Sequence, residues 1–202
     1  MALRCASGVL SLTVLLLTLM SGTFSRSTAR KPKAIPVIYD VGVCTDKKHH
    51  IEIYNVTTIM DEWGANYVTA DILFRKGMKN TSKFVVIITK CTGAKSPNLC
   101  EYYLRWVWTA AICRLIPTRG MIWSPIYDTF EPPYTCPVPP GHFLVRNATV
   151  DVDAAMALMP DKLYKYIWPV EVQLYDEHGE MIVCFVATGE ARYAKGSTGH
   201  PS

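Results

Sequence analysis

The sequence predicts an all-β protein, and three observations lead to this class. First, every even position from Tyr164 to Leu174 is apolar or aromatic, and this period-two alternation is typical of a strand with one buried face. Second, several short strand-like runs are separated by turn signals. Third, six cysteines follow an apolar N-terminal segment, an even set that is typical of exported, disulfide-bonded domains. Together these observations predict one antiparallel β-sandwich of seven or eight short strands.

The strand-like runs can be placed in chain order. They cover residues 35–41, 51–59, 67–75, 83–90, 142–152, 164–175 and 180–192. In the third run the even positions are again apolar, from Val68 to Phe74. Residues 176–179, Asp-Glu-His-Gly, predict a turn that makes the last two runs a hairpin. Because Pro169 lacks an amide hydrogen, we expect its strand to lie at a sheet edge or to be bulged.

The segment 101–116 fits two patterns. Leu104, Trp106 and Trp108 alternate with polar residues as in a strand, but the segment also carries a helical stripe. We expect a strand that breaks into one short helix near Ala110 and ends at Pro117. Residues 117–140 hold seven prolines and four aromatic residues, so we expect no regular structure there. Residues 154–160 are expected to connect two strands.

The first 25 residues have the layout of a secretory signal peptide. Arg4 precedes an apolar run over residues 9–20, and small residues follow. Twelve residues fall short of the roughly 20 that a membrane-spanning helix needs, which favours a leader over an anchor. We expect cleavage between residues 21 and 27, which removes Cys5 and leaves six cysteines. The expected mature protein is secreted, extracellular or lysosomal, with one domain over residues 26–195 and a disordered tail over 196–202.

Three N-glycosylation sequons agree with export, at Asn55, Asn80 and Asn147. Ile51 and Ile53 share the parity of Asn55 on its strand, so an outward Asn55 requires a bulge or a strand end. The chain has a formal net charge of +4, which falls by one when the leader is removed. No stripe of Lys and Arg occurs, so we expect no nucleic-acid partner.

Motifs that carry chemistry are scarce in this sequence. It contains no HExxH, no GxSxG and no glycine-rich phosphate loop. The five histidines form no spaced pair for a metal, and the cysteines lack Cys-x-x-Cys spacing. We therefore expect no enzyme, no catalytic residue, no metal and no cofactor. A hydrolase whose site shows no motif is kept as a third hypothesis.

Two connecting segments are unusually apolar. They span residues 120–127 and 154–160, and the second is rich in adaptable Met. Loops normally lie at the surface and carry polar side chains. These segments either form the rim of a hydrophobic cavity that touches a membrane, or fold back over the core with Trp123 and Leu158 as plugs.

The cysteines and their neighbours resemble a known family. The shared pattern is Cys91, Cys100, Cys113-Arg-Leu-Ile-Pro117, Cys136-Pro137 with Gly141 and Phe143, Met159-Pro160, and Gly179 to Cys184. It resembles the GM2-ganglioside activator type of the MD-2-related lipid-recognition superfamily, and also its arthropod CheB-like chemosensory branch. The resemblance covers most of residues 40–193 and is strongest over 91–190.

The resemblance implies an immunoglobulin-like β-sandwich opened into a hydrophobic β-cup. Six cysteines allow fifteen pairings; the resemblance implies Cys44–Cys184, Cys91–Cys100 and Cys113–Cys136. The activator type has a fourth bridge before its Cys-Pro motif, and this chain lacks that pair. Residues 117–135 should therefore be less constrained here.

A cup of this kind implies a cavity wall and a rim. We expect the wall to come from Trp106, Trp108, Trp168, Val170, Val172 and Leu174. We expect the rim, and a transient membrane contact, to come from Ile122, Trp123, Leu158 and Met159. The expected function is that of a lipid-binding or lipid-transfer accessory protein, which holds an acyl chain or hydrophobic semiochemical and presents it to a lipid-processing enzyme, a membrane or a sensory receptor. The alternative is a disulfide-stapled sandwich that binds protein partners and has no lipid cavity.

Overall fold

The computed structural model of the protein describes residues 33–94, 96–159 and 163–194. The expected leader over residues 1–25, the expected tail over 196–202 and Pro160 of the Met-Pro pair lie outside the described residues.

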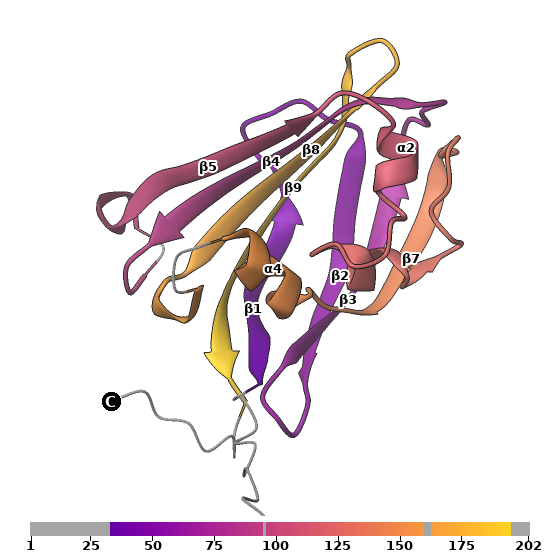
Figure 1. The fold of residues 1–202 in the computed structure, drawn as a ribbon. Helices are drawn as coiled ribbons and strands as arrows, with labels where there is room; N and C mark the ends of the chain where they lie inside the picture. The colour runs from indigo at the N-terminus through magenta and orange to yellow at the C-terminus, as the bar shows by residue number, and fades with distance from the viewer. Residues whose placement is uncertain (1–32, 95, 160–162, 195–202) are drawn as a thin grey trace, which may run out of the picture. The chain divides into compact units, whose positions relative to one another are not determined.

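The strands form two antiparallel sheets (Figure 1). The five-stranded sheet has the order β1-β9-β8-β4-β5, and the four-stranded sheet has the order β2-β3-β7-β6. The strands are β1 (Ala34–Val43), β2 (Ile51–Met60), β3 (Asn66–Phe74), β4 (Thr81–Cys91), β5 (Cys100–Trp108), β6 (Phe130–Glu131), β7 (Gly141–Ala148), β8 (Trp168–Asp176) and β9 (Met181–Tyr193). This arrangement confirms the all-β, antiparallel class.

The described helices are short. They are α2 (Ile112–Leu115), α3 (Ser124–Tyr127) and α4 (Val152–Leu158), with 3₁₀ turns at Pro97–Leu99 and Leu163–Lys165. The strand that breaks into a helix and ends at Pro117 is confirmed by β5 and α2. The expectation of one short helix is wrong, because α3 forms in the segment expected to be irregular and α4 forms in the connection after β7.

Helix α4 has a clear local cause. The Asp151 carboxylate caps its N-terminus by accepting a hydrogen bond from the Ala154 amide at 2.9 Å. From Ala154 to Leu158 the helix consists only of Ala, Met and Leu, which are strong helix formers. The strand expected over residues 142–152 therefore stops at Ala148. The strand expected over 164–175 begins only at Trp168, after a 3₁₀ turn.

Pro169 does not lie on an edge strand, so the first of the two expected alternatives is wrong; β8 does carry a bulge, but at Leu174–Tyr175, away from Pro169. Strand β8 lies inside the five-stranded sheet, between β9 and β4. Its ladder with β4 stops at Val170 and resumes as a single bridge between Ile167 and Cys91. The sheet thus accommodates the missing amide hydrogen by interrupting one ladder, while Pro169 stays paired with Thr188 of β9.

Two bulges meet on β3, and one of them is the irregularity expected at Asn55. Between the β2–β3 pairs Tyr54–Asp71 and Thr57–Thr69, two residues of β2 oppose one of β3. The β3–β7 ladder has a matching shift, at which the Asn147 amide donates to Thr69 Oγ1 at 3.2 Å. Asn55 and Asn147 have φ of 53° and 52°, a region that asparagine tolerates well. Bulges of this kind increase the local twist of a sheet.

The three disulfides join the pairs of cysteines that the resemblance implied. Cys44–Cys184 joins the end of β1 to β9 across 140 residues, and Cys91–Cys100 joins β4 to β5. Cys113–Cys136 joins α2 to the segment before β7. The first of these bridges closes the longest loop.

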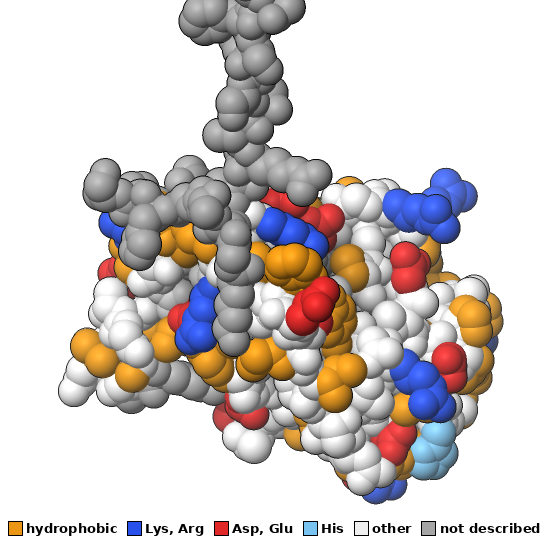
Figure 2. All heavy atoms as spheres, turned by 90° about the horizontal axis from the view of Figure 1, so that it is seen from below, with side chains coloured by type: hydrophobic (Ala, Val, Ile, Leu, Met, Phe, Trp, Pro, Cys, Tyr) orange, Lys and Arg blue, Asp and Glu red, His pale blue; other side chains and the backbone are white. Residues whose placement is uncertain are grey.

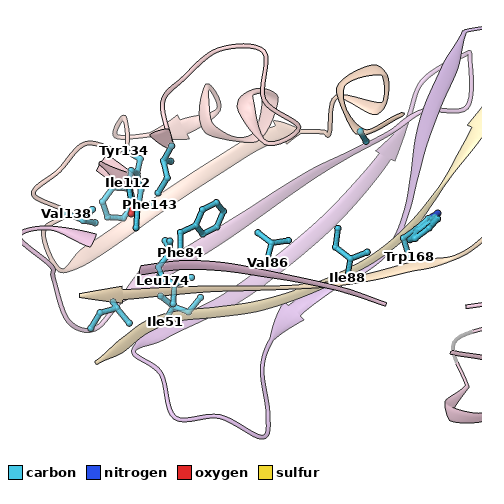
Figure 3. Packing of buried hydrophobic residues seen from close by; sticks show 14 of the residues in the cluster. Ile51, Phe84, Val86, Ile88, Ile112, Tyr134, Val138, Phe143, Trp168 and Leu174 are labelled. Atoms are coloured by element: carbon cyan, nitrogen blue, oxygen red, sulfur yellow. The ribbon is translucent and has the colours of Figure 1, made fainter. Parts of the chain in front are cut away.

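One end of the space between the sheets is filled by side chains. Tyr134, Ile112, Val138 and Phe143 cluster there, and Trp168 lies at the far end of the row formed by Phe84, Val86 and Ile88 (Figure 3). The Phe74 ring packs on Phe143 at a centroid distance of 5.1 Å. We call this region, beside α2, the solid core; it is defined by Ile51, Phe74, Ile112, Tyr134, Val138 and Phe143.

Candidate functional site

An apolar cavity of about 260 Å³ lies between the two sheets, beneath α4. The residues that line it come from both sheets, from α3 and α4, and from the segments around them. They are Pro36, Val37, Ile38, Val41, Ile53, Val68, Ala70, Ile72, Ile122, Ile126, Phe130, Val145, Ala148, Thr149, Val150, Val152, Ala155, Met159, Leu163, Trp168, Val170, Phe185, Ala187, Thr188, Gly189, Glu190 and Ala191.

Strand β9 forms the floor of the cavity with small side chains. Ala187, Gly189 and Ala191 alternate along it, so their side chains share one face of the sheet. Ala187 and Gly189 are only half-buried although they lie between two sheets. Thr188, on the opposite face, is buried. The half-buried Ala187 and Gly189 therefore mark the part of β9 that lines the cavity, whereas Ala191 on the same face is buried.

Helix α4 covers the cavity. Its apolar residues Val152 and Ala155, with Met159 directly after it, recur at helical spacing and all line the hollow. The amide of the capping residue Asp151 donates to the carbonyl oxygen of Ile122 at 3.0 Å. This bond holds the start of α4 against the segment before α3, so that Ile122 also reaches the cavity.

The lining offers an occupant almost no polar side chain. Thr149 Oγ1 donates to the carbonyl oxygen of Asn66 at 3.4 Å. Glu190 is the one charged residue among the described lining residues, and its carboxylate accepts from Arg192. Along β9, Glu190 alternates with Gly189 and Ala191, so its side chain belongs to the opposite face. The cavity therefore suits a hydrocarbon and offers no partner for a buried charge.

An aromatic group separates the cavity from the solid core. Phe130 of β6 lines the cavity, and its ring centroid lies 5.7 Å from those of Tyr127 and Tyr134 and 6.2 Å from that of Phe143. Burial raises the pKa of Tyr134 to about 12, and burial likewise raises the pKa of Tyr127. Both phenols are therefore uncharged at neutral pH, and the boundary is as free of charge as the cavity itself.

Two of the six residues expected in the cavity wall line the cavity, Trp168 and Val170. The other four, Trp106, Trp108, Val172 and Leu174, lie outside its lining. Trp108 stacks on Phe84 at 5.0 Å and lies 6.0 Å from Trp106. Leu174 is buried in the core cluster, and Val172 packs against that cluster.

The four expected rim residues also fall into two groups, those that line the cavity and those that do not. Ile122 and Met159 line the cavity, whereas Leu158 is 54% exposed on the outer side of α4. Trp123 packs edge-on against Phe84 at 5.3 Å, and its indole nitrogen donates to the Ile116 carbonyl oxygen at 3.0 Å. Trp123 therefore packs against the core as in the second interpretation, whereas the exposed Leu158 does not, so neither interpretation describes both segments.

Sequence reasoning missed the contributions of β1, β3 and α4. Pro36 to Ile38 of β1 and Ala70 of β3 line the cavity, and so does Ala155 of α4. Two signals were available: the small residue within the apolar alternation of 67–75, and the helical spacing of Val152, Ala155 and Met159 behind an aspartate cap. A small side chain that points inward indicates a cavity only when the residues that face it from the other sheet or helix are also known.

The described surface carries the three sequon asparagines, since Asn55, Asn80 and Asn147 are all exposed. On the part of the lower face that grey atoms leave visible, acidic and basic side chains are interspersed with hydrophobic ones (Figure 2).

Among the described residues, no helix has the length and hydropathy needed to cross a membrane. Cys44, Cys184 and Glu171 offer the one close set of metal-ligand atoms found in the described part, but both sulfurs are held in a disulfide.

Fold and cavity together define a class: a disulfide-bonded, antiparallel two-sheet protein with an apolar hollow between its sheets. No protein-family model matches the chain, and no curated protein sequence matches it. Among solved structures, it is similar to chicken MD-1 in a crystal structure of MD-1 complexed with lipid IVa. The sequence identity is 11%, the match covers 79% of this chain and 98% of chicken MD-1, and the TM-score is 0.33. Values this low establish nothing about function.

Proposed function

We propose that this protein is a secreted, extracellular or lysosomal, lipid-binding or lipid-transfer accessory protein. It holds an acyl chain or a hydrophobic semiochemical between its sheets and presents it to a lipid-processing enzyme, a membrane or a sensory receptor. The observation that carries the proposal is the apolar cavity of about 260 Å³, which α4 lines on one side and into which no charged side chain points. The proposal includes no chemical step, because shelter from water requires only apolar surface.

The size of the cavity sets the scale of binding. An engineered apolar cavity of about 150 Å³ binds benzene, so a cavity of about 260 Å³ has room for roughly ten carbons. At about 0.8 kcal/mol per buried methylene, ten carbons contribute roughly 8 kcal/mol before ordering costs. Transfer from water alone therefore limits the dissociation constant to about 1 μM or weaker.

The outer side of α4 is the surface that we assign to the acceptor. Leu158 and Met156 are 54% and 37% exposed there, while their neighbours Ala155 and Met159 line the cavity. An occupant could pass from the cavity to a membrane or another hydrophobic acceptor with little contact with water if α4 moved aside. This contact is transient in the proposal, because two exposed apolar side chains bury too little area for a stable complex.

Native mass spectrometry of gently purified protein from a secretory host tests the proposal. We expect hydrophobic small molecules to co-purify, and the stripped protein to bind the fluorescent hydrophobe N-phenyl-1-naphthylamine. Ala155→Trp, which fills the cavity, should abolish probe binding, whereas Ala157→Trp on the exposed side of the same helix should preserve it. Folded protein that carries no small molecule and binds no probe would favour the protein-binding sandwich instead.

A further inference from the structure

We infer that the cavity selects its occupant by chain length, and that Ile122, Phe130 and Ala155 set the limit. The occupant is a single straight hydrocarbon chain of about ten carbons with an uncharged end group. This inference rests on the proposed function and narrows the class of ligand that the site takes.

The cavity ends where the solid core begins. Phe130 stands at this boundary with one side on the hollow and its ring against Tyr127, Tyr134 and Phe143. A chain cannot pass this group without displacing packed rings, because protein interiors contain few voids larger than a water molecule. The space between the sheets is therefore available along only part of its length.

A second barrier flanks the first. Ile122 lines the cavity, and the next residue, Trp123, packs against Phe84 at 5.3 Å and Trp108 at 5.7 Å. The indole nitrogen of Trp123 is bonded to the Ile116 carbonyl oxygen, so the ring has a fixed position. Ile122 is thus held at the cavity wall by its neighbour on one side and by the Asp151 amide, which donates to its carbonyl oxygen.

The volume and the lining decide how many chains fit and of which kind. Room for roughly ten carbons admits one chain and excludes lipids with two or more long acyl chains buried together. The lining has no charged side chain that faces inward, so a carboxylate or phosphate inside would remain unpaired at high cost. Alcohols, aldehydes, esters and plain hydrocarbons carry no such charge.

A homologous series of straight-chain primary alcohols measures the limit. The probe N-phenyl-1-naphthylamine is bound first, and each alcohol of about six to sixteen carbons displaces it. For the unmodified protein, we expect affinity to rise about fourfold per methylene up to about ten carbons. Beyond that length, affinity should stay level or fall, because added carbons remain in water or press on Phe130.

Variants that change the lining by a known number of carbons should move the optimum by a similar number. Ala155→Leu adds three side-chain carbons and should shorten the preferred alcohol by about three. Ile122→Ala removes three and should lengthen it by about three, and Phe130→Ala removes six and should lengthen it by up to about six. Ala157→Leu makes the same change as Ala155→Leu on the exposed side of α4 and should leave the optimum unmoved.

The outcomes separate this inference from the proposed function. If neither the probe nor any of the alcohols binds to the protein, the proposed function fails. If alcohols bind but affinity climbs steadily to sixteen carbons, or if Ile122→Ala and Ala155→Leu leave the optimum in place, the length limit is overturned while lipid binding stands. Ile122→Ala is the gentler of the two enlarging variants, so a folding defect in Phe130→Ala leaves the inference testable.

Discussion

The buried carboxylate of Asp176 gives the sharpest test of how the β8–β9 hairpin is held. Asp176 is 1% exposed, and its oxygens accept hydrogen bonds from the amides of His178 and Glu180 at 2.9 and 2.8 Å and from Lys76 Nζ at 3.0 Å. Asp176→Asn keeps the shape but removes the charge and one acceptor. Hydrogen bonds to charged groups are worth about 1.5–3 kcal/mol, and Lys76 keeps Glu180 as a partner. We expect a loss of about 2–3 kcal/mol in the free energy of unfolding.

The same carboxylate makes a prediction about pH. Desolvation raises the pKa of Asp176, but the Lys76 ammonium and the amides of Glu180 and His178 outweigh it and hold the pKa below its ordinary value. A group with a depressed pKa in the folded state stabilises the protein above its unfolded pKa, and this stabilisation is lost as pH falls through the folded pKa. The stability gap between wild type and Asp176→Asn should therefore be fully present at pH 7 and narrow below about pH 4.

Urea unfolding followed by tryptophan fluorescence at several pH values measures both effects. The control is Asp128→Asn, which removes an exposed carboxylate after α3 and should change stability by less than about 0.5 kcal/mol. An Asp176→Asn variant as stable as wild type at pH 7 would refute the structural reasoning. A gap that stays constant on acidification would refute the assignment of the charge.

Three further predictions concern the disulfides, the aromatic packing and the glycans. Replacing Cys44 and Cys184 together by Ser opens the 140-residue loop and should cost about 5 kcal/mol of unfolding free energy, against about 2.6 kcal/mol for the nine-residue Cys91–Cys100 loop. Equal losses in denaturant titrations would contradict the loop-length account. Trp108→Ala removes the ring stacked on a neighbouring phenylalanine and should cost about 3 kcal/mol, and an unchanged melting curve would show that this packing is not stabilising. Replacing each exposed sequon asparagine singly by Gln should remove one step of electrophoretic mass from secreted protein, and any position without a shift carries no glycan.

Much of the fold could be predicted from local pattern. Alternation placed the strands because a half-buried sheet imposes a period of two on the sequence. The turn at Gly179 and the end of the short helix before Pro117 were visible because glycine and proline act within a few residues. The bulge at Asn55 followed from a conflict between a glycosylation site and the apolar parity of its strand.

The candidate site was less predictable, because it depends on which faces meet across the sheets. Alternation alone assigned Trp108 and Leu174 to the same inner surface as Val170, and it could not show that Phe84 and Trp123 fill the space beside them. The position of Pro169 failed for a similar reason, since a strand's neighbours are set by the whole topology. Ala155 escaped notice because a small residue has no visible role until the space beside it is known.

The separation of the solid core from the cavity has a consequence for how such a protein can diversify. Two of the bridges lie next to fully buried side chains in the sequence: Cys184 of Cys44–Cys184 is two residues from Ile182, and Cys113 of Cys113–Cys136 follows Ile112. Substitutions at Ala155 or Ala187 change the lining of the cavity, which includes neither of these bridges. The preference for an occupant can therefore change through residues that take no part in either disulfide.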